Sequence, residues 1–251
     1  MTRAVPPTAG ARLLADLAAL GPYFAVDVHR PGSPVRQPWQ PLGELTGSPG
    51  ALAGRIGEVR ERLAAAAGCP AAAVEFSVAA SIAQLGLCAR LLSPALGAAA
   101  AGRALPVDIA QARWVPALGG PFRLSLAREA IAAEPADTAI AAEPGTAATT
   151  ALLAGPVTQI VRAVEAMAVS PRVLWGNVAS AVNGAATMIA AARPELAGRA
   201  AEAAAALLGY PDLAGTYQGR PLEGFRRRNC CLIYRLSPER PAYCGDCVLG
   251  R

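Results

Sequence analysis

Apolar residues along this chain gather in long stretches rich in alanine and leucine, and such stretches are typical of α-helices. Proline and glycine interrupt them, because proline lacks a backbone donor and glycine adopts conformations that end helices. Ser170 followed by Pro171 is a typical helix start, with serine as the cap and proline in the first turn. The pattern predicts helices at residues 12–20, 49–67, 71–92, 148–168, 171–192 and 195–208.

Shorter segments favour β structure. Tyr23–His29 alternates in polarity and contains β-branched and aromatic residues, so we expect a strand there. Residues 105–126 predict two strands around Gly119-Gly120-Pro121, and residues 232–236 predict another short strand. Stretches rich in proline, glycine or small polar residues predict loops at 30–50, 132–147 and 210–225. The expected fold class is therefore mainly α with minor β (α+β).

The length of 251 residues fits one large domain with a small appendage. We expect a helical domain at 1–225 and a small C-terminal lobe at 226–251. Apolar residues make up 53%, enough for a sizeable core without cross-links. All 23 basic residues are arginine, and the net charge of +5 is spread along the chain. No basic and aromatic stripe is evident, so no nucleic-acid partner is expected.

The apolar stretch Leu13–Leu20 is too short for a secretion signal and contains Asp16. The run Leu91–Gly102 is too short to cross a membrane and contains Pro94. We therefore expect a cytoplasmic protein with no membrane span. Thiols stay reduced in the cytoplasm, so clustered cysteines there indicate metal binding rather than a disulfide.

Four of the six cysteines lie in the last 22 residues, at Cys230, Cys231, Cys244 and Cys247. Four thiolates suffice for a Zn²⁺ ion or an iron–sulfur cluster. Cys244 and Cys247 have a gap that zinc sites use, whereas adjacent cysteines converge on one ion only if the backbone bends. A cluster of several irons accepts such a pair more easily, although the spacing differs from ferredoxin patterns. Structural zinc remains an alternative, and ideal geometry disfavours a disulfide between adjacent residues.

The segment Cys230–Leu236, followed by Tyr243–Cys247, closely resembles the C-terminus of the FhuF-like ferric siderophore reductases. That family carries a [2Fe–2S] cluster on a C-C-x₁₀-C-x₂-C pattern. Here 12 residues separate the two cysteine pairs, two more than in the pattern. The excess falls in the Ser237–Pro241 turn, where insertions cost little. Leu174–Asn177, with the sequence Leu-Trp-Gly-Asn, resembles another recurrent segment of the family.

The resemblance implies that the four cysteines bind a [2Fe–2S] cluster, which reduces Fe(III) in hydroxamate-type siderophores so that Fe(II) is released. The chain has no P-loop and no GxGxxG fingerprint, so a separate electron donor such as a ferredoxin or a reductase is expected. The alternative is a non-enzymatic interaction protein with a structural zinc site made of the four cysteines. A relative of siderophore synthetases is disfavoured, because those enzymes require an ATP site.

Further residues near these motifs have two readings each. Trp175 and Asn177 either face a siderophore cleft or serve the core, as large aromatics and buried amides usually do. Arg226–Arg228 either guides an acidic redox partner or an anionic chelate, or is solvated surface. We also expect backbone amides near Gly245 and Asp246 to donate to cluster sulfurs.

The remaining candidates are isolated. His29 lies two residues after Asp27 on the expected strand, so the two side chains share a face and can form a hydrogen bond. Cys69 and Cys88 stand apart in predicted helices, where we expect them to act as small buried hydrophobic residues.

Overall fold

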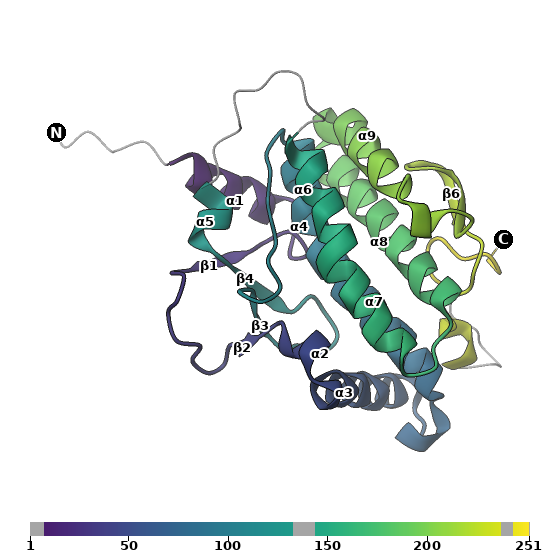
Figure 1. The fold of residues 1–251 in the computed structure, drawn as a ribbon. Helices are drawn as coiled ribbons and strands as arrows, with labels where there is room; N and C mark the ends of the chain where they lie inside the picture. The colour runs from purple at the N-terminus through teal and green to yellow at the C-terminus, as the bar shows by residue number, and fades with distance from the viewer. Residues whose placement is uncertain (1–7, 133–143, 237–242, 251) are drawn as a thin grey trace.

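The computed structural model describes residues 8–132, 144–236 and 243–250, and it confirms a mainly α fold with minor β structure (Figure 1). The α-helices are α1 (Ala9–Ala19), α2 (Glu44–Gly47), α3 (Pro49–Ala67), α4 (Phe76–Ala100), α5 (Arg128–Ala132), α6 (Pro144–Leu152), α7 (Thr158–Glu165), α8 (Pro171–Ala192) and α9 (Ala197–Leu208). The strands are β1 (Asp27–His29), β2 (Gln40–Pro41), β3 (Arg113–Val115), β4 (Arg123–Ala127), β5 (Tyr217–Arg220) and β6 (Glu223–Arg227). A π-helical turn, η2 (Leu153–Val157), joins α6 to α7.

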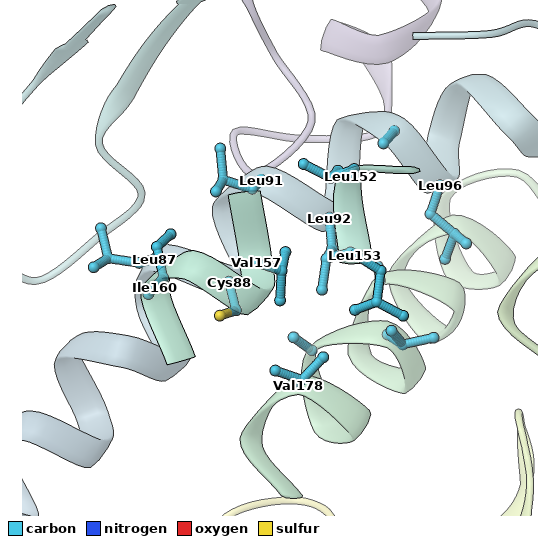
Figure 2. Close-up of a cluster of buried hydrophobic side chains, with 14 of the residues drawn as sticks. Leu87, Cys88, Leu91, Leu92, Leu96, Leu152, Leu153, Val157, Ile160 and Val178 are labelled. Carbon is cyan, nitrogen blue, oxygen red and sulfur yellow. The ribbon is translucent and has the colours of Figure 1, made fainter. Parts of the chain in front are cut away.

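Helix α4 lies at the centre of a bundle and packs against α3, α6, α8 and α9. Figure 2 shows Leu92 of α4 beside Val157, which lies between α6 and α7, and Leu87 of α4 beside Ile160 of α7. All of these side chains are buried. A helix with apolar residues around most of its circumference can bury all of them only in the middle of a bundle. The predicted helices at 49–67 and 171–192 are confirmed with the same bounds.

The predicted end of the second long helix at Leu92 is wrong, because α4 continues through Pro94 to Ala100. A proline inside a helix removes one backbone hydrogen bond and costs about 3 kcal/mol. The last turns of α4 are buried throughout, so tertiary packing outweighs that cost. Gly97 lets the first helix approach closely, since a Cβ there would lie 2.9 Å from the Leu17 side chain.

The larger sheet has the strand order β1-β4-β3-β2, in which only β1 and β4 pair in parallel. The two strands predicted within 105–126 are confirmed as β3 and β4. The strand predicted from Tyr23 begins only at Asp27. The buried guanidinium of Arg90 in α4 donates hydrogen bonds to the backbone carbonyls of Tyr23 and Ala25, so these carbonyls do not pair with a neighbouring strand. Desolvation lowers the pKa of Arg90 to about 10.

The chain before the cysteines folds differently from the prediction. Residues 210–225, expected to be a loop, contain β5 and the start of β6, which form an antiparallel hairpin. Gly219 lies against the opposite strand, where a Cβ would be 2.3 Å from the Gly224 carbonyl oxygen. Glycines with positive φ therefore allow a tight, irregular pairing that composition did not reveal. Strand β6 also crosses residue 225, the expected division between domain and tail, and that division stays a prediction.

The strand predicted at 232–236 is wrong, because Ile233–Leu236 forms the 3₁₀ turn η5. Leu232 has a φ of 71°, in the left-handed region, and so reverses the chain directly after the cysteine pair. Arg235 of η5 then reaches Glu75 at the start of α4, with 3.0 Å between nitrogen and carboxylate oxygen. The predicted turn at Ser237–Pro241 and most of the loop at 132–147 lie outside the described residues.

Among the residues that the structure describes, three helical segments are long and apolar enough to cross a membrane by length and composition, namely α4, Gly145–Glu165 and α8. The apolar windows of α4 and α8 are each 67% buried within the protein, so much of this surface already packs on other helices. The expected absence of a membrane span stays a prediction.

Candidate metal centre in the C-terminal tail

The cysteine pairs come together on one side of the bundle, where the hairpin and the C-terminus lie against α8 (Figure 1). The thiol of Cys244 donates a hydrogen bond to the sulfur of Cys231. The charge of Cys247 raises the pKa values of Cys230 and Cys244. Cys231 and Cys247 are buried, at 1% and 5% exposure, while the other two are half-buried. The structure thus brings the two cysteine pairs near one another, with Cys231 and Cys244 joined by a hydrogen bond.

The four thiols are not equivalent. The hydrogen bond from Cys244 lowers the pKa of Cys231 to about 6, helped by a backbone amide at Ile233 and opposed by burial. The same bond raises the pKa of Cys244, because that thiol keeps the shared proton. Burial raises the pKa of Cys230. In the metal-free tail Cys231 is therefore deprotonated more easily than Cys230 or Cys244, and a cation that replaces the proton shared with Cys244 would meet a prepared ligand.

Helix α4 holds the backbone of the first cysteine pair, Cys230 and Cys231, through a hydrogen bond from Ser81. The fully buried hydroxyl of Ser81 donates to the carbonyl oxygen of Cys231 over 2.8 Å. Asn177 of α8 holds that serine through its amide nitrogen, which lies 3.0 Å from Ser81 Oγ and 2.9 Å from Gln84 Oε1. A buried chain of this kind keeps its members in one geometry, because each group would lose a partner if another moved.

Helix α8 fixes the second pair through Asp246, which lies between Cys244 and Cys247. Its carboxylate accepts hydrogen bonds from Ser180 Oγ at 2.8 Å and from Asn183 Nδ2 at 3.0 Å. Its carbonyl oxygen accepts from the backbone amide of Arg227 at 3.0 Å. The loop between these two cysteines is thus tied both to α8 and to the end of β6.

Arg227 is the most unusual group at this site. Its side chain is fully buried, yet within the described residues it forms no salt bridge with a carboxylate. Its Nε donates to the Asn229 carbonyl at 2.9 Å and its Nη2 to the Val173 carbonyl at 3.2 Å, whereas Nη1 has no partner among those residues. Its charge favours the thiolate forms of Cys230, Cys231 and Cys244. Burying an arginine costs several kcal/mol unless an anion compensates it, so this environment fits an anionic centre at the cysteines.

The Leu174–Asn177 segment of α8 packs against the buried guanidinium of Arg227. A Cβ on Gly176 would lie 2.9 Å from Arg227 Nη2, so a larger residue there would force that buried guanidinium to shift. Trp175 packs partly buried against the core, 6.1 Å from the Tyr210 ring. Asn177 is fully buried. These contacts match the expectation that Trp175 and Asn177 serve the core.

The arginine run differs from the solvated surface that the sequence allowed. Arg227 is buried, and only its neighbours Arg226 and Arg228 are exposed. Among backbone amides of the described tail, Leu232 and Leu249 donate to the sulfurs of Cys230 and Cys247, each at 3.3 Å, and Ile233 donates to Cys231. Donation to cluster sulfurs from amides near Gly245 and Asp246 stays a prediction.

The remaining candidates are not members of the cysteine quartet. His29 Nδ1 lies 2.8 Å from Ser125 Oγ on the neighbouring strand, while Asp27 pairs with Arg123 at 3.2 Å. Cys88 is fully buried, as expected, and desolvation raises the pKa of its thiol to about 12. Cys69 is half-buried at the end of α3.

Sequence reasoning missed the polar side chains that anchor the tail, and a signal for them is present. Ser81 and Gln84 are three residues apart on α4, and Asn177, Ser180 and Asn183 repeat the same spacing on α8. Most other buried residues of the two helices are apolar, with Arg90 and Ser93 of α4 as exceptions. A polar stripe at helical spacing within an apolar helix indicates a buried partner that needs hydrogen bonds.

In the described part of the chain, no three His, Cys, Asp or Glu side chains are grouped closely enough to hold a single metal ion. Ligation by the four cysteines therefore stays a prediction, supported by the hydrogen bond between Cys231 and Cys244 and by the unpaired charge of Arg227. Neither the protein-family models nor the curated proteins compared with this chain give a match.

Proposed function

We propose that this protein is a cytoplasmic ferric-siderophore reductase whose cysteine quartet, Cys230, Cys231, Cys244 and Cys247, holds a [2Fe–2S] cluster. The observation that carries the proposal is the buried, unpaired charge of Arg227, which favours the thiolate forms of Cys230, Cys231 and Cys244. A buried cation needs a negative neighbour, and a cluster bound by four thiolates has net negative charge in both redox states.

When bound, the cluster would take one electron from a separate donor protein and pass it to the Fe(III) of a hydroxamate chelate, which then releases Fe(II). The chain supplies the surroundings. Arg227 compensates negative charge at the sulfurs, and the amides of Leu232 and Leu249 donate to them. Such outer groups set the reduction potential and orient the ligands. Ser81 and Asp246 hold the ligand backbones in place.

Structural zinc is the competing outcome, because four thiolates around Zn²⁺ also form an anionic centre that Arg227 would compensate. The discriminating test is anaerobic purification, followed by visible absorption, iron and acid-labile sulfide analysis, and electron paramagnetic resonance after reduction. We expect charge-transfer bands, and equal amounts of iron and sulfide. Mixing the reduced protein with ferric hydroxamates should then yield trapped Fe(II).

The matched variants are Cys244→Ser, which should remove the bands, and Cys69→Ser, which should keep them because Cys69 lies outside the tail. Colourless protein with one zinc per chain would establish the alternative. Protein free of both iron and sulfide would refute the cluster, and a reduced cluster that no ferric hydroxamate oxidises would refute the reductase activity.

A further inference from the structure

A cavity of about 230 Å³ lies between α3, α4 and the segment that joins β3 to β4. Its walls are mainly apolar, with Val59 and Leu63 from α3, Ile82 and Leu87 from α4, and Phe122 from the connecting segment. No aspartate or glutamate is among the described residues that line it. None of the four cysteines lines this cavity.

Arginines give the cavity its charge and its shape. Arg55 is already engaged, because it pairs with Glu58 at 3.1 Å, donates to the Ala117 carbonyl and lies over Trp114. Arg62 is exposed at the cavity and pairs with no carboxylate within the described residues. An apolar cavity whose rim carries an uncompensated cation is complementary to a ligand with an apolar body and an anionic group.

The cavity and the cysteine tail are in contact with the same two helices. Ile82, on the cavity wall, directly follows Ser81, whose hydroxyl bonds the Cys231 carbonyl, so these two side chains leave α4 about 100° apart. The turn η5, which begins two residues after Cys231, packs against both α3 and α4, the two helices that form the cavity. A ligand in the cavity would therefore lie on the helix that also anchors the backbone of a predicted cluster ligand.

We propose that this cavity binds an apolar arm of an anionic ferric hydroxamate chelate, with Arg62 pairing with its carboxylate at the rim. The inference rests on the proposed function for the identity of the ligand. The volume is below the roughly 300–1,000 Å³ of sites that enclose whole drug-sized molecules, so it takes one arm and leaves the iron centre outside. Neutral chelates, which lack a partner for Arg62, bind more weakly.

Gly86 provides a direct test, because it lines the cavity and a Cβ built on it meets nothing within 4 Å. Gly86→Leu should fill the space, and replacing a helical glycine favours folding. Gly198→Leu is the matched control, since Gly198 is exposed on α9 and a Cβ there also meets nothing within 4 Å. Circular dichroism and thermal unfolding check that each variant folds.

The probe is the Ga(III) complex of a carboxylate-bearing hydroxamate chelator with an apolar chain, because Ga(III) is not reduced under these conditions and binding is measured without electron transfer. Calorimetric titration of the full-length protein, purified anaerobically, should show at least about tenfold weaker binding for Gly86→Leu, and no change for Gly198→Leu. Arg62→Gln should weaken binding of this complex about fivefold and leave its methyl ester unaffected.

Unchanged binding in folded Gly86→Leu would overturn the proposal, even if the protein reduces ferric chelates. An unchanged preference for the carboxylate over the ester in Arg62→Gln, which alters an exposed side chain, would overturn it too and covers the case of a Gly86→Leu variant that fails to fold. Loss of binding in the variants of a protein that contains no cluster would support the cavity while refuting the reductase.

Discussion

The attachment of the cysteine loop to α8 through Asp246 can be tested without any metal. Asp246→Ala removes the carboxylate that accepts from Ser180 at 2.8 Å and from Asn183 at 3.0 Å. The backbone bond between Asp246 and Arg227 remains. The substitution should therefore leave the bundle folded and loosen the loop that carries Cys244 and Cys247.

The size of the effect follows from these two bonds. A hydrogen bond to a charged group contributes about 1.5–3 kcal/mol, and Asp246 is half-buried, so the lower end applies to each bond. Together the two bonds contribute about 3 kcal/mol to keeping the loop closed. Since about 1.4 kcal/mol corresponds to a factor of ten, the open population should rise about a hundredfold.

Thiol alkylation of the reduced, metal-free protein, read out by mass spectrometry, measures this opening at individual cysteines. Cys247 is 5% exposed, so it reacts mainly from the open state, and its rate should rise about a hundredfold in Asp246→Ala. Cys88, fully buried in α4, reports global unfolding and should keep its rate. Asp246→Asn retains an acceptor for Asn183 and a donor for the Ser180 hydroxyl, so we expect an intermediate rate.

Two results would show that the reasoning is wrong. If Cys247 reacts at the same rate in Asp246→Ala and in the unmodified protein, the two bonds do not hold the loop. If Cys88 accelerates as much as Cys247, the aspartate stabilises the whole protein rather than the loop. Ser180→Ala combined with Asn183→Ala should reproduce the effect, and adding Asp246→Ala should then change little.

Two further predictions concern the same site. Gly176→Ala places a Cβ 2.9 Å from Arg227 Nη2, so it should lower the free energy of unfolding by about 1–3 kcal/mol in urea titrations. Gly184→Ala on the same helix meets open space and should not destabilise the protein. Equal urea midpoints for the two variants would contradict the assigned packing. The pKa of Cys231 is lowered to about 6, below its unfolded value of about 8.5, so this group stabilises the metal-free fold above pH 8.5 and the contribution is lost as pH falls through 6. The lowered pKa of Cys231 should therefore make stability increase between pH 6 and 8.5, whereas the raised pKa of Cys244 should make it fall above pH 8.5. Urea midpoints that do not vary across this range would refute the shared proton.

Local sequence signals found the long helices, because their ends depend on nearby residues. Pro49 and Pro171 start α3 and α8 where proline costs nothing, and Gly68 ends α3 in the left-handed conformation that glycine adopts freely. The same local rule failed at Pro94, where the helix continues because the following turn is buried on all sides. A proline's effect on its own helix is local, but the packing that opposes it comes from residues far away in the sequence.

The candidate site divides in the same way. The four cysteines could be selected from the sequence, because their residue type and spacing in the tail carry the chemical signal. Their surroundings could not, because Ser81 lies 150 residues from Cys231 and Gly176 lies 51 residues from Arg227. Nothing in the local sequence of the arginine run distinguishes buried Arg227 from its two exposed neighbours.

By itself, then, the sequence determined the helical class, the positions of most long helices and the cysteine quartet, since backbone propensity and thiol chemistry are properties of residues and their near neighbours. The tertiary structure alone decided which arginine is buried, which polar residues of α4 and α8 hold the tail, and that a cavity lies between α3 and α4. Burial and hydrogen-bond partnership depend on contacts between distant segments, and these form only when the bundle packs.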